Sequence, residues 1–169
     1  TMVRSHLDYA VCIWTPHSKQ LTENIERVQR RATKLLNKNR EKNYKERLKY
    51  LKLPTLAYRR VRGDMIEVYK ILTGVYDSAV SPDLSLSDYL HTRGNVMKLN
   101  TTRAKYDVRK YFFSIRVASV WNSLPNKVIE SKSIDEFKTS LDSHWKNEEI
   151  IYDYKAKITG TGVRGMDNI

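Results

Sequence analysis

The stretch SKQLTENIERVQRRATKLLNK, residues 18–38, predicts one amphipathic helix with two opposite faces. Apolar residues recur in it at alternating spacings of four and three, which is the period of one helical stripe. This apolar stripe consists of Leu21, Ile25, Val28, Ala32 and Leu35. We expect the stripe to pack into a core, and Ser18 to cap the start of the helix.

The second face of this helix is basic. At about 100° per residue it lies roughly 200° from the apolar stripe. Its cations are Arg27, Arg30, Arg31, Lys34 and Lys38. A single face of this kind is either an ordinary solvated surface or a binding surface for anions, and the distribution of charge decides between the two.

Positive charge is concentrated in one block of the chain. Of the 169 residues, 31 are Lys or Arg and 19 are Asp or Glu, which gives a net charge of +12. Residues 19–62 alone carry fifteen Lys or Arg and four Glu, so nearly all the excess lies there. Such a block indicates a surface for a polyanion. Nucleic acid is the first candidate, an acidic membrane surface the second and an acidic protein the third.

A membrane partner is disfavoured, because the basic helix lacks the bulky aromatic residues of helices that lie in a bilayer interface. No apolar run approaches the ~20 residues that span a bilayer. The single cysteine, Cys12, excludes an internal disulfide and fits a reducing compartment. We therefore expect an intracellular protein, nuclear or cytoplasmic or both, with no membrane partner. The oligomeric state is left open.

The remaining pattern predicts an all-α fold, an irregular bundle of about five helices. A long internal loop is expected over residues 75–107. Residues 1–146 are expected to form the helical region, and residues 147–169 a polar, disordered tail. Besides the opening helix, the periods predict helices over residues 2–14, 43–51, 56–73, 108–123 and 134–145.

Local signals fix several of these boundaries. Asn43 with Glu46, and Ser133 with Glu136, have the spacing of capping boxes. Thr55 is expected to cap the helix that follows it. Gly74 is expected to end that helix in the left-handed conformation.

The predicted helix 56–73 carries three further cations, Arg59, Arg60 and Arg62, next to Gly63. A glycine inside a helix costs about 1 kcal/mol relative to alanine. Gly63 is therefore either a tolerated weakness or a place where another backbone or a phosphate comes close. The two interpretations stay open here.

A second, weaker basic cluster includes Arg109 and Lys110, with Phe112 and Phe113 nearby. Aromatic side chains beside cations can stack on bases while the cations meet phosphate. Aromatics of this kind are more often part of a core, and we expect that of Phe112 and Phe113. Residues 96–99 are expected to form a short strand or an extended arm on the helices, and residues 92–95 a turn.

No catalytic or metal-binding pattern is found. Paired aspartates of a two-metal site, a glycine-rich phosphate loop and Cys/His spacing for zinc are all missing from the sequence. Asp64 and Glu67 lie three residues apart among arginines, so we expect them to be ion-paired and not catalytic. We expect no catalytic residue, no metal ligand and no cofactor in this chain.

Several segments resemble one family in sequence order. The segments are RSHLDYA at residues 4–10, VQRRATKL at 28–35, LPTL at 53–56, YRRVRGDMI at 58–66, FFSIRV at 112–117 and WNSLP at 121–125. They resemble motifs of non-LTR (LINE-type) retrotransposon reverse transcriptases, above all those of jockey-like and chicken-repeat-like elements. The resemblance covers about residues 3–146. Cys12 and Ile13 depart from it, since a small residue and a proline are usual before Trp14.

The resemblance implies the thumb and post-thumb segment of an RNA-directed DNA polymerase, which holds template RNA and primer DNA. The catalytic aspartates, with their Mg²⁺, would belong to a palm that this chain does not contain, so the chain would be inactive alone. Its expected partners are RNA or an RNA–DNA hybrid and the missing palm and fingers. The residues expected to contact nucleic acid are Arg27, Arg30, Arg31, Lys34, Lys38, Arg59, Arg60, Arg62, Arg109 and Lys110. The alternative is a retrotransposon-derived helical module that binds an acidic protein or its parent polymerase.

Overall fold

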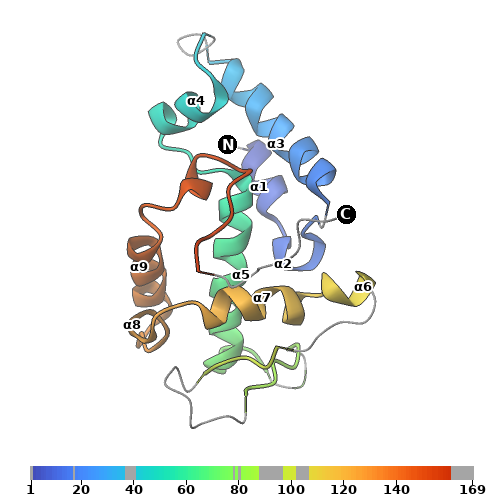
Figure 1. The fold of residues 1–169 in the computed structure, drawn as a ribbon, viewed down its shortest axis with the longest axis vertical. Coiled ribbons are helices and arrows are strands. Elements are labelled where there is room, and N and C mark those ends of the chain that lie inside the picture. Colours follow the sequence, from blue (N-terminus) through green and yellow to red (C-terminus); the bar gives the residue numbers. More distant parts are fainter. Residues whose placement is uncertain are drawn as a thin grey trace. The chain divides into compact units, whose positions relative to one another are not determined.

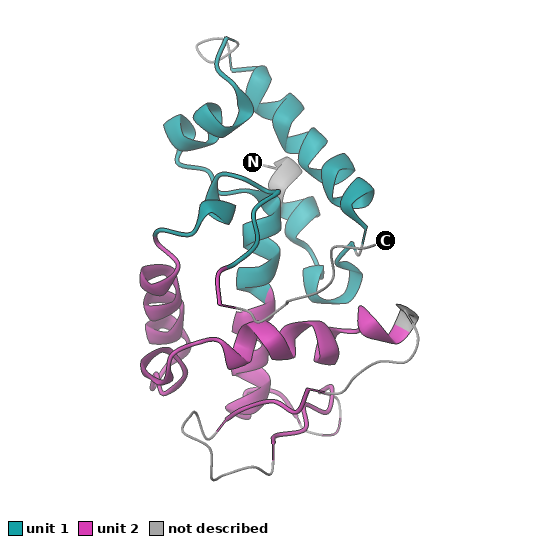
Figure 2. Ribbon diagram, in the orientation of Figure 1, with its two compact units in different colours: residues 1–63, 147–158 teal, residues 64–146, 159–169 magenta. Residues whose placement is uncertain are grey.

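The computed structural model describes residues 2–16, 18–36, 41–77, 79, 81–87, 97–101 and 107–160. It is helical, so the prediction of an all-α fold is confirmed (Figure 1). Among the described residues, β-structure is limited to an isolated antiparallel bridge between Leu86 and Leu99. The chain forms two compact units: residues 1–63 with 147–158, and residues 64–146 with 159–169 (Figure 2).

Unit 1 begins with two short helices, α1 (Met2–Asp8) and α2 (Val11–Trp14), where one helix was expected over residues 2–14. That prediction is wrong at Ala10, which has a left-handed φ of 49°. The indole of Trp14 donates to the carbonyl oxygen of Tyr9. This bond takes up a carbonyl that a continuous helix would have bonded to a backbone amide. The end of the helical segment before Pro16 is as predicted.

The helix that opens the basic block, α3 (Lys19–Lys34), starts as predicted, because the hydroxyl of Ser18 accepts the amide of Leu21. Its inward face is not the predicted one. Three residues of the apolar stripe face outward, among them Val28, 42% exposed, and Leu35, 76% exposed, whereas Ile25 and Ala32 are half-buried. The side chains that α3 buries are polar: Glu26, Gln29 and Thr33.

The reason for this orientation is the start of α5 (Leu56–Leu72). The first amides of a helix have no partner within the helix. Oε1 of Glu26 accepts the amide of Leu56 at 2.6 Å and that of Ala57 at 3.1 Å. Gln29 donates to the carbonyl oxygen of Pro54 at 3.1 Å. The polar face of α3 therefore satisfies the α5 terminus, and three residues of the apolar stripe are left outside.

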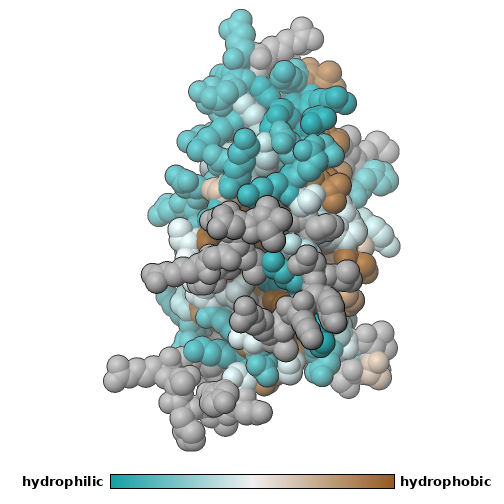
Figure 3. All heavy atoms as spheres, turned by 45° about the vertical axis from the view of Figure 1, so that its right-hand side comes forward, coloured by the Kyte–Doolittle hydropathy of each residue, from teal (hydrophilic) through white to brown (hydrophobic). Residues whose placement is uncertain are grey.

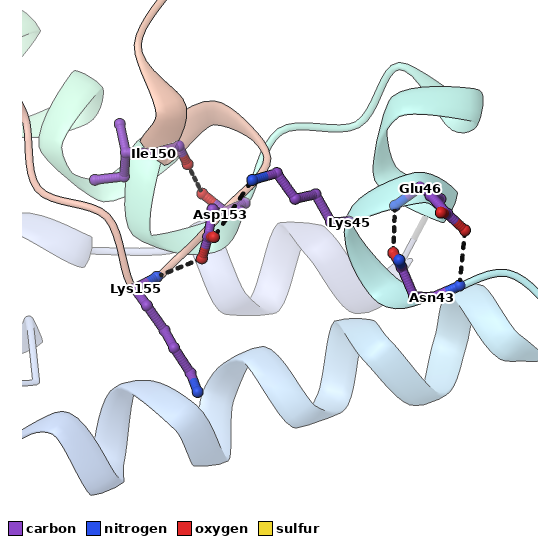
Figure 4. A network of polar contacts seen from close by, with 7 residues as sticks. Asn43, Lys45, Glu46, Ile150, Asp153 and Lys155 are labelled. Carbon is purple, nitrogen blue, oxygen red and sulfur yellow. Dashed lines mark hydrogen bonds and ion pairs between the residues drawn. The ribbon is translucent and has the colours of Figure 1, made fainter.

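The next helix, α4 (Tyr44–Leu51), has the predicted capping box. Asn43 accepts the amide of Glu46, and Glu46 accepts the amide of Asn43 (Figure 4). Leu48 is buried, as expected, but so is Arg47. Arg47 donates to the carbonyl oxygen of Lys42 and to Oγ1 of Thr33, so its guanidinium forms hydrogen bonds inside unit 1.

Both boundary predictions for α5 are confirmed. The hydroxyl of Thr55 accepts the amide of Tyr58, and Gly74 follows the helix with a left-handed φ of 70°. Met65 and Val68 of the predicted apolar stripe are fully buried. At Gly63, an added Cβ would meet no described atom within 4 Å. Close approach of another backbone at Gly63 is therefore wrong for the described part of the chain, and approach of a phosphate stays a prediction.

Residues 147–158 belong to unit 1, and the predicted disordered tail is wrong for this part. They include the short 3₁₀ helix η2 (Glu149–Ile151) and the buried Ile150. Thr55 holds the segment twice: its amide donates to the carbonyl oxygen of Ile151 at 2.8 Å, and its hydroxyl to that of Ile150 at 2.6 Å. These bonds join residues about a hundred positions apart, which no local pattern reveals.

Unit 2 contains α6 (Asp107–Lys110), α7 (Phe113–Asn122), α8 (Asn126–Ile129) and α9 (Ile134–His144). One helix was expected over residues 108–123, but it is interrupted before α7, where Phe112 is extended. Phe112 is 61% exposed, so the expectation that it is a core residue is also wrong, while Phe113 is half-buried. The short α8 was not predicted. Ser133 caps α9 as expected, although Glu136 accepts the amide of Lys132.

Aromatic packing forms the core of unit 2. The rings of Tyr69 and Phe137 stack with centroids 4.3 Å apart, and Trp121 lies 5.9 Å from Phe137. Leu99 is extended and tied to α7, because the Asn122 side chain both donates to its carbonyl oxygen and accepts its amide, each at 2.9 Å. Residues 97–99 are thus the predicted arm on the helices. The turn predicted at residues 92–95 lies outside the described residues.

Candidate nucleic-acid interface

Three cations lie exposed on one side of α3: Arg27, Arg31 and Lys34. Their spacings of four and three residues place them along one line of the helix surface. Among the described residues, no carboxylate pairs with any of the three within 4.0 Å. Hydrophilic atoms cover most of the upper part of the face in Figure 3. We call Arg27, Arg31 and Lys34 the basic row.

Arg30 lies at the border between the basic row and the buried face of α3, and aromatic rings hold it. Its guanidinium carbon is 5.2 Å from the centroid of the Tyr44 ring and 5.7 Å from that of Tyr154. Nη2 of Arg30 also donates to the hydroxyl of Tyr154 at 3.0 Å. Arg30 therefore joins three segments of unit 1, and its charge is partly engaged before any ligand arrives.

An open recess of about 320 Å³ lies beside Arg30. Figure 4 shows Lys45 and Asp153, which form an ion pair at 3.5 Å, and Lys155, whose amide donates to Asp153. The recess therefore combines aromatic rings with an excess of positive charge. Its lining consists of Arg30, Asn43, Tyr44, Lys45, Tyr152, Asp153, Tyr154 and Lys155.

The hydroxyl of Tyr44 connects this recess to the interior of unit 1. It donates to Oε2 of Glu26 and accepts from Gln29 at 3.2 Å. Burial, together with the negative charge of Glu26 and the hydrogen bond to it, raises the pKa of Tyr44 far above its ordinary value. The hydroxyl of Tyr44 therefore keeps its proton at physiological pH and donates it in the hydrogen bond to Glu26.

The three predicted cations of α5 are less available than the basic row. Arg59 forms a two-bond ion pair with Asp8, in which Nε donates to Oδ1 at 3.1 Å. Arg60 is 3% exposed, and its guanidinium lies over the ring of Trp14, 5.2 Å from the centroid. Arg62 is half-buried. Burial removes Arg60 from the set of side chains that can meet phosphate in this conformation.

The remaining predicted site residues lie elsewhere. Lys38 is outside the described residues. Arg109 is exposed and Lys110 half-buried, and both belong to unit 2. The structure thus brings together the α3 residues Arg27, Arg30, Arg31 and Lys34, with Arg59, Arg60 and Arg62 in the same unit.

Sequence reasoning missed the residues that complete the site from far along the chain. Tyr154 and Lys155 fell in the predicted tail, and Glu26 in a helix whose inward face was expected to be apolar. One signal was present: Tyr152 and Tyr154 follow two isoleucines, Ile150 and Ile151, in the stretch that was predicted to be a polar tail. Tyrosines at that spacing are more typical of a packed segment than of disorder.

The acids of α5 that the sequence singled out are both ion-paired. Asp64 binds Arg116 through two hydrogen bonds, of 2.9 and 3.2 Å, and Glu67 pairs with Lys70, as predicted for these acids. Within the described ranges, no cluster of three or more His, Cys, Asp or Glu could hold a metal ion. None of the described helices has the length and apolar character needed to cross a membrane.

Comparison of the chain with protein-family models, with curated proteins and with solved structures finds no match.

Proposed function

We propose that this chain binds nucleic acid without sequence specificity through the basic row of α3. The observation that supports the proposal is the row itself: three exposed cations on one helix, none ion-paired among the described residues. The +11 excess over residues 19–62 adds a long-range attraction for a polyanion. The motif resemblance supports the narrower proposal that the chain is the thumb and post-thumb segment of a non-LTR retrotransposon reverse transcriptase.

The dimensions of the row suit a phosphate backbone. Arg27 and Lys34 are seven residues apart, about 10 Å along the helix axis. One strand of a duplex presents a phosphate about every 3.4 Å of its axis, so the row can reach two or three phosphates. Arginines and lysines on phosphates hold a duplex in place without reading its sequence. An RNA–DNA hybrid is the ligand that the resemblance favours.

The recess beside Arg30 supports the same function. Proteins hold unpaired nucleotides with aromatic faces that stack on bases and cations that neutralise phosphates. The recess offers Tyr152 and Tyr154 together with Lys45 and Lys155. We propose that it receives a single-stranded end of the nucleic acid bound along the row.

Catalysis is not part of the proposed function of this chain. In the proposed polymerase, Mg²⁺ and the aspartates that hold it belong to the palm. In this proposal the described residues of this chain bind the template and the primer. Polymerase activity would require the palm and fingers as partners.

The test is hybrid binding by the variant R27Q/R31Q/K34Q, measured by fluorescence anisotropy over a range of salt concentrations. Each lost phosphate contact lowers the slope of log K against log [salt] by about 0.9. For two or three lost contacts we expect the slope to fall by about 1.8 to 2.7, and the affinity at low salt to fall by more than tenfold. The matched control is K127Q/K132Q/K146Q, which removes the same charge at three exposed lysines of unit 2.

If both triple variants weaken binding equally, the effect is one of net charge and the basic row is not the site. An unchanged salt slope in R27Q/R31Q/K34Q would sink the proposal outright. The alternative, an acidic protein on the same row, is tested by competition. The competitor is polyglutamate, added at the same concentration of negative charge as the hybrid. If polyglutamate displaces the hybrid, the binding does not require a nucleic-acid backbone, and the protein-binding module is favoured.

A further inference from the structure

The apolar stripe of α3 is exposed along one edge of the described structure, at Leu21, Val28 and Leu35, while Ile25 and Ala32 are half-buried. Leu21 is 44% exposed, Val28 42% and Leu35 76%. The neighbouring Leu36 is 50% exposed. The hydrophobic patches of Figure 3 lie among the hydrophilic atoms of the upper part of the drawn face. Exposed apolar surface costs about 25 cal/mol per Å², and soluble proteins rarely keep a continuous stripe of it unused.

The spacing of the stripe indicates what shape would cover it. Leu21, Val28 and Leu35 are seven residues apart, and Ile25 and Ala32 form a second series with the same period. These are the a and d positions of a coiled-coil seam, in which side chains of one helix insert between those of a second helix. The covering element is therefore a helix with its own apolar seam.

Charge beside the stripe selects the kind of helix. Arg31 lies three residues after Val28 and four before Leu35, so on the helix surface it is a neighbour of both. This is a g position, where charge sets the choice of partner in coiled coils. A second copy of this chain would bring the same basic block and would be repelled. A bilayer is disfavoured because the seam carries no aromatic residue.

We propose that the stripe of α3 docks an amphipathic helix of another protein, whose apolar seam is flanked by carboxylates. The apolar side chains of the partner helix pack against the stripe, and its carboxylates face Arg31. Arg31 belongs both to this surface and to the basic row, whereas Val28 and Leu35 have no role in binding anions, so substitutions at these two residues test the docking surface alone. The proposal stands whether or not the basic row binds nucleic acid.

The probe is a synthetic peptide of about four heptads, with leucine at a and d and glutamate at e and g. A matched peptide has lysine at e and g, and a third has serine in place of the seam leucines. We expect this chain to bind the glutamate peptide at least about tenfold more tightly than either control peptide, a difference that anisotropy titration resolves readily.

Variants of this chain locate the site. Val28→Ser and Leu35→Ser should each weaken binding of the glutamate peptide at least about tenfold. Val75→Ser, at an exposed apolar residue of unit 2, should leave it unchanged. Because Val28 and Leu35 are exposed, both variants should fold, which circular dichroism checks. Hybrid affinity should stay as in the wild type, so a failure of this proposal is distinguishable from a failure of the basic row.

Three outcomes would overturn the proposal: equal binding of the glutamate and lysine peptides, no effect of both stripe variants, or no binding of any peptide. Two further measurements distinguish other occupants of the stripe: sedimentation equilibrium of the chain alone, and binding to anionic vesicles. A dimer of the wild-type chain that Val28→Ser dissociates would identify a second copy as the occupant. Binding to anionic vesicles that is lost in Val28→Ser would identify a lipid surface instead.

Discussion

Oε1 of Glu26, at the middle of α3, accepts a hydrogen bond of 2.6 Å from the amide of Leu56, the first residue of α5. The carboxylate is fully buried and accepts two further bonds, from the amide of Ala57 and the hydroxyl of Tyr44. A negative charge is most stable at a helix N-terminus, where amides point outward and the helix dipole is positive. This relationship fixes which side of α3 faces inward.

Replacement of Glu26 should therefore destabilise unit 1 strongly. Glu26→Ala leaves buried amides without an acceptor, and we expect the free energy of unfolding to fall by about 3 kcal/mol. Glu26→Gln keeps one acceptor oxygen and should cost about half as much. Urea unfolding followed by circular dichroism measures both. Glu23→Gln, on the more exposed side of the same helix, is the control and should stay within about 0.5 kcal/mol of wild type. Equal stability of Glu26→Ala and Glu23→Gln would contradict the capping role.

Local signals were enough to predict where several helices begin and end. Ser18, Asn43 with Glu46, Thr55 and Gly74 all act within a few residues of their own position, so their geometry follows from the adjacent sequence. The same holds for the basic row, whose alignment depends only on helical period. These features needed no knowledge of the rest of the chain.

The orientation of α3 could not be predicted in this way. Its apolar stripe is the stronger local signal, but the amides that Glu26 satisfies lie thirty residues later. The return of residues 147–158 to Thr55, and with it the contact of Tyr154 with Arg30, is a still longer relationship. The contact of Arg60 with the ring of Trp14 is also long-range, and Trp14 follows the left-handed turn at Ala10.

Gly63 offers a stabilising substitution. It lies inside α5, and an alanine Cβ would meet no described atom within 4 Å. Gly63→Ala should raise the free energy of unfolding by about 1 kcal/mol, because alanine restricts the unfolded chain and favours the helix. Gly74→Ala is the informative counterpart. With its φ of +70°, alanine there should cost about 1 kcal/mol. A loss of stability in Gly63→Ala would show that the position receives a close neighbour after all.

Removal of one partner of the ion pair between Asp64 and Arg116 should destabilise unit 2 strongly. The two side chains are only 7% and 17% exposed, and the guanidinium donates twice. Removal of one partner of a buried pair leaves an uncompensated charge, so Asp64→Asn should cost about 3 kcal/mol. Arg116→Lys keeps the charge but loses the two-bond geometry, and its cost should be smaller. Lys138→Gln breaks a more exposed pair with Asp135 and should cost less than about 1 kcal/mol. Thermal unfolding measures the loss of stability in the three variants. Equal losses would show that the pair of Asp64 with Arg116 matters no more than the exposed pair.

Tyr44 should make the stability of unit 1 depend on alkaline pH. Its pKa is raised in the folded state, first by burial and then by Glu26, whereas in the unfolded chain it is about 10. Above that pH the unfolded chain releases the proton and the folded chain keeps it. The stabilisation is therefore complete below pH ~10 and decreases as pH rises further.

The measurement is the urea midpoint of wild type and Tyr44→Phe between about pH 7 and pH 11. The pKa values of Tyr69 and Lys70 are also raised, Tyr69 by burial and Lys70 by its hydrogen bond with Tyr76, so both proteins should lose stability at high pH. The loss should be steeper in the wild type, because only there does Tyr44 titrate. Tyr50→Phe, at an exposed ring, should follow the wild-type profile. Parallel profiles for wild type and Tyr44→Phe would show that the hydroxyl of Tyr44 titrates alike in the folded and unfolded chain, and that its bond to Glu26 does not hold the proton.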